Sequence, residues 1–92
     1  MRTVYDPAYI EFVARLRAAR KATGHTQGAL AELLHKPQSF VSKVETCERR
    51  IDVIEAARWC VALGVTLADV LPANLTATGN SGTTHRAFKT SR

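Results

Sequence analysis

The stretch TQGALAELLHKPQSFVSKVETCERR, residues 26–50, decides the fold. Thr26 precedes an apolar run with helical spacing, so its hydroxyl is placed to cap the first amides of a helix. Pro37 ends that helix, because proline cannot continue it, and its fixed φ suits the start of the next one. Val41 and Val44 give the second helix an inward side. The stretch therefore predicts two short helices joined by a tight turn, the first with a broad apolar face made of Leu30, Ala31, Leu33 and Leu34.

The residues before this stretch predict a longer helix. Asp6 and Pro7 provide a carboxylate cap followed by a first-turn proline. Gly24 can turn the chain where this helix ends. The inward-facing residues recur at helical spacing: Phe12, Val13, Leu16 and Arg20.

The residues after the stretch predict a fourth helix and a last short turn. Asp52 is placed to cap the fourth helix, and Glu55 follows three residues later, close to a capping box. Gly64 ends this helix. A last turn runs from Leu67 to Leu71, and Pro72 stops it. We expect a buried stripe on the fourth helix made of Val53, Ala56, Trp59, Cys60 and Leu63.

No segment alternates as a β-strand would, so the fold class is all-α: a compact bundle of four to five helices over residues 1–72. From residue 73 to residue 92 the chain is rich in Thr, Ser, Gly and Asn. Phe88 is the one large apolar residue late in this segment, which is too little apolar surface to support folding. We therefore expect residues 73–92 to be a polar, flexible and disordered tail.

Composition permits an anionic partner and argues against several other classes. Lys plus Arg is 13 and Asp plus Glu is 8, which gives a net charge of +5, compatible with nucleic acid but not specific for it. Cys47 and Cys60 are too few for a disulfide scaffold, and no secretory signal or apolar span is visible, so we expect a cytoplasmic protein with free thiols. His25, His35 and His85 have no partners at metal-ligand spacing, and no catalytic pair stands out. We expect no metal, no cofactor and no enzymatic activity.

The stretch and its continuation resemble the Xre family, the lambda-repressor-like helix-turn-helix regulators. The segment DVIEAARWCVALGV, residues 52–65, resembles the helix that follows the helix-turn-helix in this family. The resemblance extends over about residues 10–71. The matching residues within the stretch are Thr26, Gln27, Leu30, Ala31, Leu34, Gln38, Ser39, Val41, Ser42, Lys43 and Glu45.

The resemblance implies that residues 38–45 form the recognition helix, which lies in the major groove of DNA. Gln38 is then a base-reading residue, because its amide can bond both N6 and N7 of adenine. Ser39, Ser42 and Lys43 are implied to contact bases or phosphates from the same helix. Gln27 resembles the family's phosphate clamp, at a helix start whose first amides lack internal partners.

Four neighbouring positions leave alternatives open. Phe40 should lie near the rim, because two valines already fill the inward side. It either packs on the first helices or touches a thymine methyl or a deoxyribose. Arg49 and Arg50 are interpreted as phosphate contacts beside the groove, the alternative being a loop charge pair balanced by nearby carboxylates. Lys36, in the turn, either contacts phosphate or is solvated.

Arg20 and Glu45 are implied to form a structural ion pair instead of touching DNA. The sequence also departs from the family pattern at three positions. His35 and Cys47 stand where the family often has glycine, so a positive φ there would carry a steric penalty. Pro37 replaces the usual Ser or Thr cap of the recognition helix, which leaves one more amide open.

These observations predict a sequence-specific, double-stranded DNA-binding transcriptional regulator, a repressor that binds a palindromic operator as a homodimer. One recognition helix reads only a few base pairs, so two half-sites one DNA turn apart are expected. The expected dimer surface is the last short helix, residues 67–71, with neighbouring parts of the fourth helix. The alternative is an antitoxin or adaptor-type module that also binds DNA and contacts a protein partner through its tail.

Overall fold

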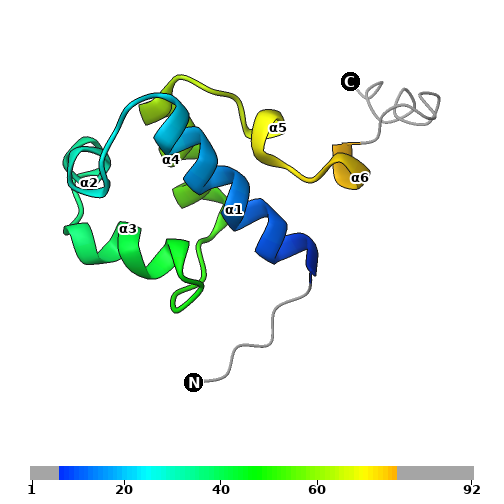
Figure 1. The fold of residues 1–92 in the computed structure, drawn as a ribbon, viewed down its shortest axis with the longest axis horizontal. Helices are drawn as coiled ribbons and strands as arrows, with labels where there is room; N and C mark the ends of the chain where they lie inside the picture. The colour runs from blue at the N-terminus through cyan, green and yellow to red at the C-terminus, as the bar shows by residue number, and fades with distance from the viewer. Residues whose placement is uncertain (1–6, 77–92) are drawn as a thin grey trace.

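The computed structural model describes residues 7–76, and every regular element in this range is an α-helix (Figure 1). The fold class expected from the sequence is thus confirmed. Helix α1 is the longest, and α2 and α3 form the consecutive short pair (Figure 1). In chain order the helices are α1 (Pro7–Ala22), α2 (Gln27–Leu34), α3 (Gln38–Glu45), α4 (Val53–Leu63), α5 (Leu67–Val70) and α6 (Ala73–Thr76).

Side-chain caps set where α2, α4 and α5 begin. The Thr26 hydroxyl accepts from the amide of Ala29 at 3.0 Å. At α4, Asp52 accepts from the Glu55 amide at 2.7 Å, and the Glu55 carboxylate accepts from the Asp52 amide at 3.1 Å. This reciprocal pair is the expected capping box, which satisfies two amides that the helix itself leaves open. Thr66 caps α5 in the same way.

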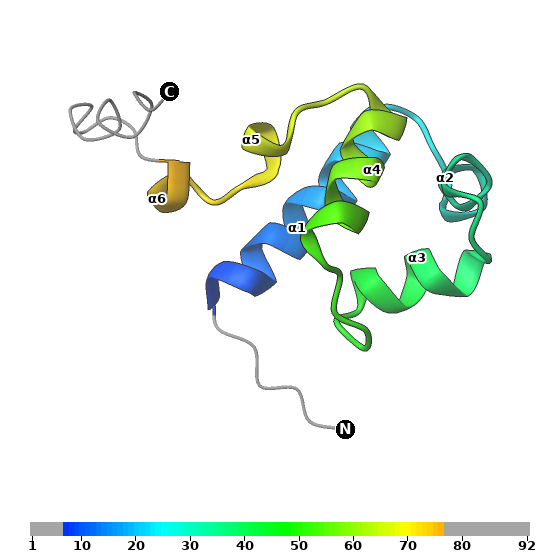
Figure 2. The ribbon, with the colours of Figure 1, turned by 180° about the vertical axis from the view of Figure 1, so that it is seen from behind.

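The core lies where α1, α2, α3 and α4 meet, and Figure 2 shows α4 in front of α1 with α2 beside it. Trp59 is fully buried at its centre, and its indole Nε1 donates to the carbonyl of Leu16 at 3.4 Å. Val41 and Val44 of α3 are also fully buried. Cys60 packs in this core, and burial raises the pKa of its thiol. These inward positions agree with the sequence prediction.

Two residues expected on buried faces are exposed instead. Val53 opens α4 with 65% of its surface exposed, and Leu33 on α2 is 50% exposed. Val53 is the first residue of α4, and Ile51, two residues before it, is the one that is buried in the core. The other four residues of the expected α4 stripe are buried as predicted: Ala56, Trp59, Cys60 and Leu63.

The helices continue past Pro72, which corrects the expected end of the folded part. Pro72 is itself buried, and α6 adds one helical turn, Ala73–Thr76, that the sequence assigned to the tail. Val70 of α5 is also buried, 1% exposed. The expected cap at Asp6 and the rest of the predicted tail, residues 77–92, lie outside the described residues.

Within residues 7–76, none of the helices combines the length and apolarity that crossing a bilayer requires.

His35 and Cys47 both adopt the left-handed backbone conformation, which is the case in which the sequence analysis expected a steric penalty. Their φ angles are 58° and 65°. Each residue directly follows or closely follows a helix, where a left-handed residue lets the chain reverse direction. A Cβ atom in this conformation approaches the neighbouring carbonyl oxygen, so both positions carry a steric cost that glycine avoids.

Replacing Cys47 by glycine should therefore stabilise the protein. We expect Cys47→Gly to raise the free energy of unfolding by about 0.5–1 kcal/mol, since relief of the left-handed strain exceeds the extra backbone entropy of glycine. Urea unfolding followed by circular dichroism measures this change. The matched control Ala14→Gly, at an exposed site in α1, should lower it by about 1 kcal/mol. A loss of stability in Cys47→Gly would contradict the strain argument.

Candidate nucleic-acid interface

Helix α3 is divided into a buried side and a polar outer side. Val41 and Val44 anchor α3 to the core, and the most extensive contact of α3 is with α2. Four polar residues share the outer side: Gln38, Ser39, Ser42 and Lys43. Ser42 is half-buried and the other three are exposed. The bundle therefore holds these side chains on a fixed helix with their polar atoms toward solvent.

The N-terminus of α3 lacks a side-chain cap. Pro37 occupies the cap position with an extended backbone and offers no hydrogen-bonding side chain. The Phe40 amide donates to the Pro37 carbonyl at 2.9 Å, so the amides of Gln38 and Ser39 are the ones left to bond solvent or an anion. This arrangement is the one expected from the replacement of the usual Ser or Thr by proline.

The expected ion pair between Arg20 and Glu45 is present and buried. Arg20 Nε donates to Glu45 Oε2 at 2.7 Å, and Arg20 Nη2 donates to Oε1 at 3.0 Å. The two side chains are only 8% and 3% exposed. The remaining Nη1 donates to the carbonyl of His25 at 2.8 Å, so each of the three guanidinium nitrogens donates a hydrogen bond. This pair joins the end of α1 to the end of α3.

Gln27 extends this pair toward the outer side of α3. Its Nε2 donates to Glu45 Oε1 at 3.0 Å, and its Oε1 accepts from Gln38 Nε2 at 3.3 Å. A continuous chain of hydrogen bonds thus runs from Arg20 through Glu45 and Gln27 to Gln38. The sequence analysis did not find this chain, because it treated Gln27 only as a phosphate contact. That contact stays a prediction, and one N–H of the Gln27 amide remains for it.

Phe40 lies in the core, and the expected position at the rim is wrong. Its side chain is 7% exposed and belongs to the main hydrophobic cluster. Lys36 Nζ lies 5.2 Å from the ring centroid and the guanidinium carbon of Arg49 lies 4.7 Å from it. Both distances are within the range of cation–π attraction. The structure thus favours the packing alternative and leaves little of the ring to meet a ligand.

The loop after α3 is tied to α4 and α1 by its two arginines. Arg49 donates to the Glu55 carboxylate at 3.1 and 3.2 Å. These bonds raise the pKa of Arg49 and hold the pKa of Glu55 below its ordinary value, an effect that the Asp52 amide reinforces. Arg50 lies over the Tyr9 ring, 4.4 Å from its centroid. Arg49 is therefore balanced by a nearby carboxylate, as the alternative of a loop charge pair expected. The phosphate contacts of Arg49 and Arg50 stay predictions.

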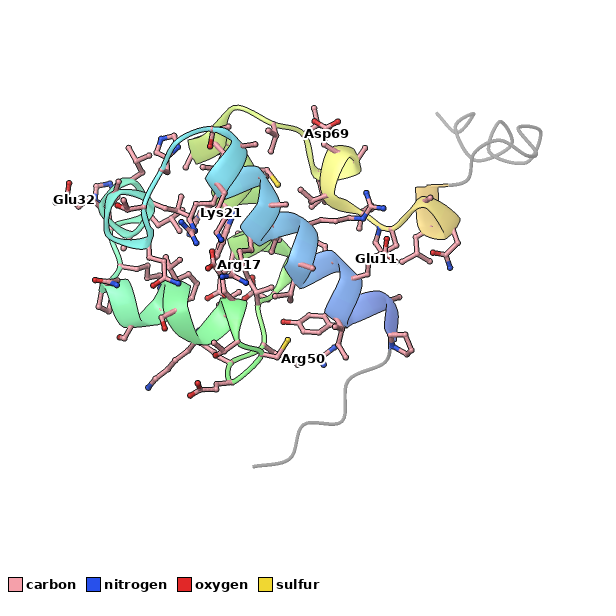
Figure 3. All side chains as sticks on the ribbon, in the orientation of Figure 1. Glu11, Arg17, Lys21, Glu32, Arg50 and Asp69 are labelled. Atoms are coloured by element: carbon pink, nitrogen blue, oxygen red, sulfur yellow. The ribbon has the colours of Figure 1, made fainter. Side chains whose placement is uncertain are left out.

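Arg17 is a further cation at this surface, which the sequence analysis did not include among the site residues. Its side chain is 55% exposed, and its Nε lies 3.8 Å from Glu45 Oε1. Figure 3 shows Arg17 between α1 and α3 and Arg50 near the loop after α3. Arg17 lies one turn before Arg20 on α1, and both side chains are neighbours of Glu45. Helical spacing from Arg20 is the sequence signal that places it there.

No group of three or more His, Cys, Asp or Glu side chains in the described part of the chain is arranged to hold a metal ion.

Comparison with known proteins gives the same assignment as the geometry. The profile of the family described as helix-turn-helix domain matches residues 11–73. An XRE-family like protein from Pseudomonas syringae pv. tomato str. DC3000 is 44% identical, with a TM-score of 0.66 over 68% of this chain and 77% of that one. The restriction-modification controller protein C.AhdI from Aeromonas hydrophila is 28% identical, with a TM-score of 0.64 over 68% and 96%.

A third solved structure shares the fold alone. Hydroxypropylphosphonic acid epoxidase from S. wedmorenis is 23% identical, with a TM-score of 0.66, and the match covers 74% of this chain but 36% of the epoxidase. Among proteins of curated function, none matches this chain.

The packed pair α2–α3, with polar side chains on the outer side of its second helix, defines a helix-turn-helix protein. The chain belongs to the helix-turn-helix domain family and is of the XRE type. It is accordingly a DNA-binding protein.

The buried ion pair generates a stability prediction. We expect Arg20→Met to lower the free energy of unfolding by about 3–5 kcal/mol, because the Glu45 carboxylate would be left in a buried site without its main partner. The control is Arg15→Met, which breaks the exposed pair with Glu11 at 2.7 Å. That change should cost about 0–1 kcal/mol. Urea unfolding compares the two, and equal losses would show that burial adds nothing to the Arg20 pair.

Proposed function

We propose that this chain is a sequence-specific transcriptional regulator that inserts α3 into the major groove of double-stranded DNA. The observation that carries the proposal is the fixed outer side of α3, where Gln38, Ser39, Ser42 and Lys43 are presented by a helix anchored in the core. A major groove admits one α-helix, and these side chains supply the donors and acceptors that base edges match. The cytoplasm, with the nucleoid, is the proposed location.

Gln38 is the proposed base reader, and Gln27 is proposed to orient it. A side-chain amide has one oxygen acceptor and two N–H donors. Gln27 takes one N–H of Gln38. The oxygen and the second N–H remain, which are the two atoms that a bidentate contact with adenine N6 and N7 requires. An amide already held by a neighbour loses less rotamer freedom on binding.

Cations around α3 are proposed to hold the phosphates on either side of the groove. Lys36 precedes α3, Arg50 follows it, and Arg17 lies beside it on α1. Phosphate contacts of this kind fix the register of a recognition helix without reading sequence. The amides of Gln38 and Ser39, which directly follow Pro37, add donors for the same purpose.

A dimer acting as a repressor on a palindromic operator is the proposed form. Because Val70 is buried, the apolar surface available near α5 comes instead from its neighbours. A hollow of about 240 Å³ opens there, lined by α1 and α6 residues that include Tyr9, Phe12 and Leu75. Leu75 on α6 is 55% exposed and Val53 on α4 is 65% exposed. We therefore place the proposed dimer contact at α5, α6 and the start of α4.

Variants of α3 and of its flanking cations should have different effects on DNA binding. Gln38→Ala should weaken binding to the specific site by about 1–3 kcal/mol and change binding to random duplexes little. Arg50→Ala should weaken both and reduce the salt slope by about one unit. Fluorescence anisotropy with an operator selected from random duplexes measures both effects. Equal losses on specific and random DNA in Gln38→Ala would show that it is not a base reader.

The dimer proposal predicts a molecular mass of two chains. Light scattering should give this mass at high protein concentration, and Leu75→Glu should shift it to one chain, because the charge would be buried in the contact. A mass of one chain for the unchanged protein, both with and without operator, would contradict dimerisation.

A further inference from the structure

Helix α4 carries a second apolar stripe that faces away from the core. Ile54, Arg58 and Val61 recur at i, i+4 and i+7 and so share one side of the helix. Ile54 is 56% exposed and Val61 is 78% exposed. Contiguous exposed apolar patches mark interaction surfaces, whereas single exposed apolar residues are normal, so what adjoins these two residues decides their meaning.

This stripe forms one wall of a groove whose other wall is the end of α2. The groove has a volume of about 570 Å³, and its apolar lining includes Leu33 and Leu34 from α2 and Val61 from α4. A smaller hollow of about 180 Å³ continues it toward the start of α4, where Ile54 lies. The two hollows share Leu34, Lys36 and Arg58. From Ile54 to Val61 the groove follows α4 for about 10 Å, or two helical turns.

The charges at this groove have one sign where the groove is widest. Lys36 and Arg58 are the charged residues that line the larger hollow, and no acidic residue lines it. The smaller hollow contains Glu55, which is already bonded by Arg49, and Asp52, which caps α4. An occupant must therefore supply apolar side chains for the floor and carboxylates for the rim.

We propose that the groove between α2 and α4 docks an amphipathic helix of another protein, with acidic residues flanking its apolar stripe. The carboxylates of this partner lie against Lys36 and Arg58, and its apolar side chains cover Leu33, Val61 and Ile54. The four polar residues of α3 are not among the residues that line either hollow. The docking surface thus excludes the proposed base-reading residues of α3, shares Lys36 with the proposed phosphate contacts, and does not depend on the proposed function.

Charge argues against the two occupants that this chain itself could provide. The segment 77–92 contains His85, Arg86, Lys89 and Arg92 but no acidic residue, so it would meet a rim of its own sign. A second copy docked symmetrically would bring the same basic rim residues of both chains toward each other. Like charges brought together in an interface oppose association.

The test uses the full-length chain and a synthetic peptide. The peptide has about 18 residues, with leucines at i, i+3, i+4 and i+7 and glutamates on both sides of that stripe. It is titrated into the isotopically labelled protein and followed by amide chemical shifts. We expect saturable shifts in α4 and the end of α2. An analogue with lysine in place of glutamate should bind about tenfold more weakly.

Exposed substitutions in the groove separate specific docking from attraction to a basic protein. Arg58→Glu and Val61→Ser should each weaken peptide binding about tenfold, the first through the rim and the second through the floor. Lys21→Glu changes the net charge as Arg58→Glu does, but on α1, and should change the affinity less than about twofold. Both groove positions are exposed, so the fold should persist, which the amide spectrum checks.

Several results would overturn the proposal. The first is that the acidic peptide shows no saturable binding. The second is that Arg58→Glu and Lys21→Glu weaken peptide binding equally. The third is a set of shifts centred on α3, which would mean that the acidic peptide replaces phosphate. Occupation by a second copy would appear as loss of a dimer in Val61→Ser. Occupation by the tail would appear as tighter peptide binding in Phe88→Ala.

Discussion

The buried pair of Arg20 and Glu45 is the interaction on which the arrangement of the helices depends. Helices α2 and α3 are short, and helices of this length are marginal on their own. Their geometry must therefore come from tertiary contacts. The bidentate contact fixes both the distance and the angle between the ends of α1 and α3, because a planar guanidinium can donate two parallel hydrogen bonds to a carboxylate in few orientations. Gln27 joins the same carboxylate and brings the start of α2 to the same point.

The sequence predicted the helices well wherever a local chemical signal marks an end. Thr26, the Asp52–Glu55 box and the left-handed residues after α2 and α3 all act within a few residues of the chain, so their effect can be read without the fold. Faces were harder to predict. Periodicity shows that Val53, Leu33 and Phe40 lie on helices, but whether a face is covered depends on where other helices end. Phe40 is covered, while Val53 and Leu33 are not.

The candidate site shows the same division between local and distant information. The family resemblance placed Gln38, Ser39, Ser42 and Lys43 on one helix, and the structure puts their polar groups on its outer side. It did not indicate that Gln38 bonds Gln27, eleven residues earlier, because no spacing rule connects two different helices. Arg49 was ambiguous for a similar reason. Glu55 became its partner only because the capping box turns that carboxylate back toward the loop.

The net charge of +5 is therefore a poor measure of what the surface attracts. Arg20 and Arg49 are held by carboxylates of the protein itself, and the Arg20 pair is almost inaccessible to solvent. The charge of Arg20 contributes little to binding an anion, since a partner would have to displace a buried bond, whereas Arg49 is 42% exposed and its phosphate contact stays a prediction. Lys43 on α3 and Arg58 on α4 are exposed on different helices. The two proposals thus assign the cationic surface to two anions of different shape: a phosphate backbone at α3 and a row of carboxylates beside the apolar groove at α4.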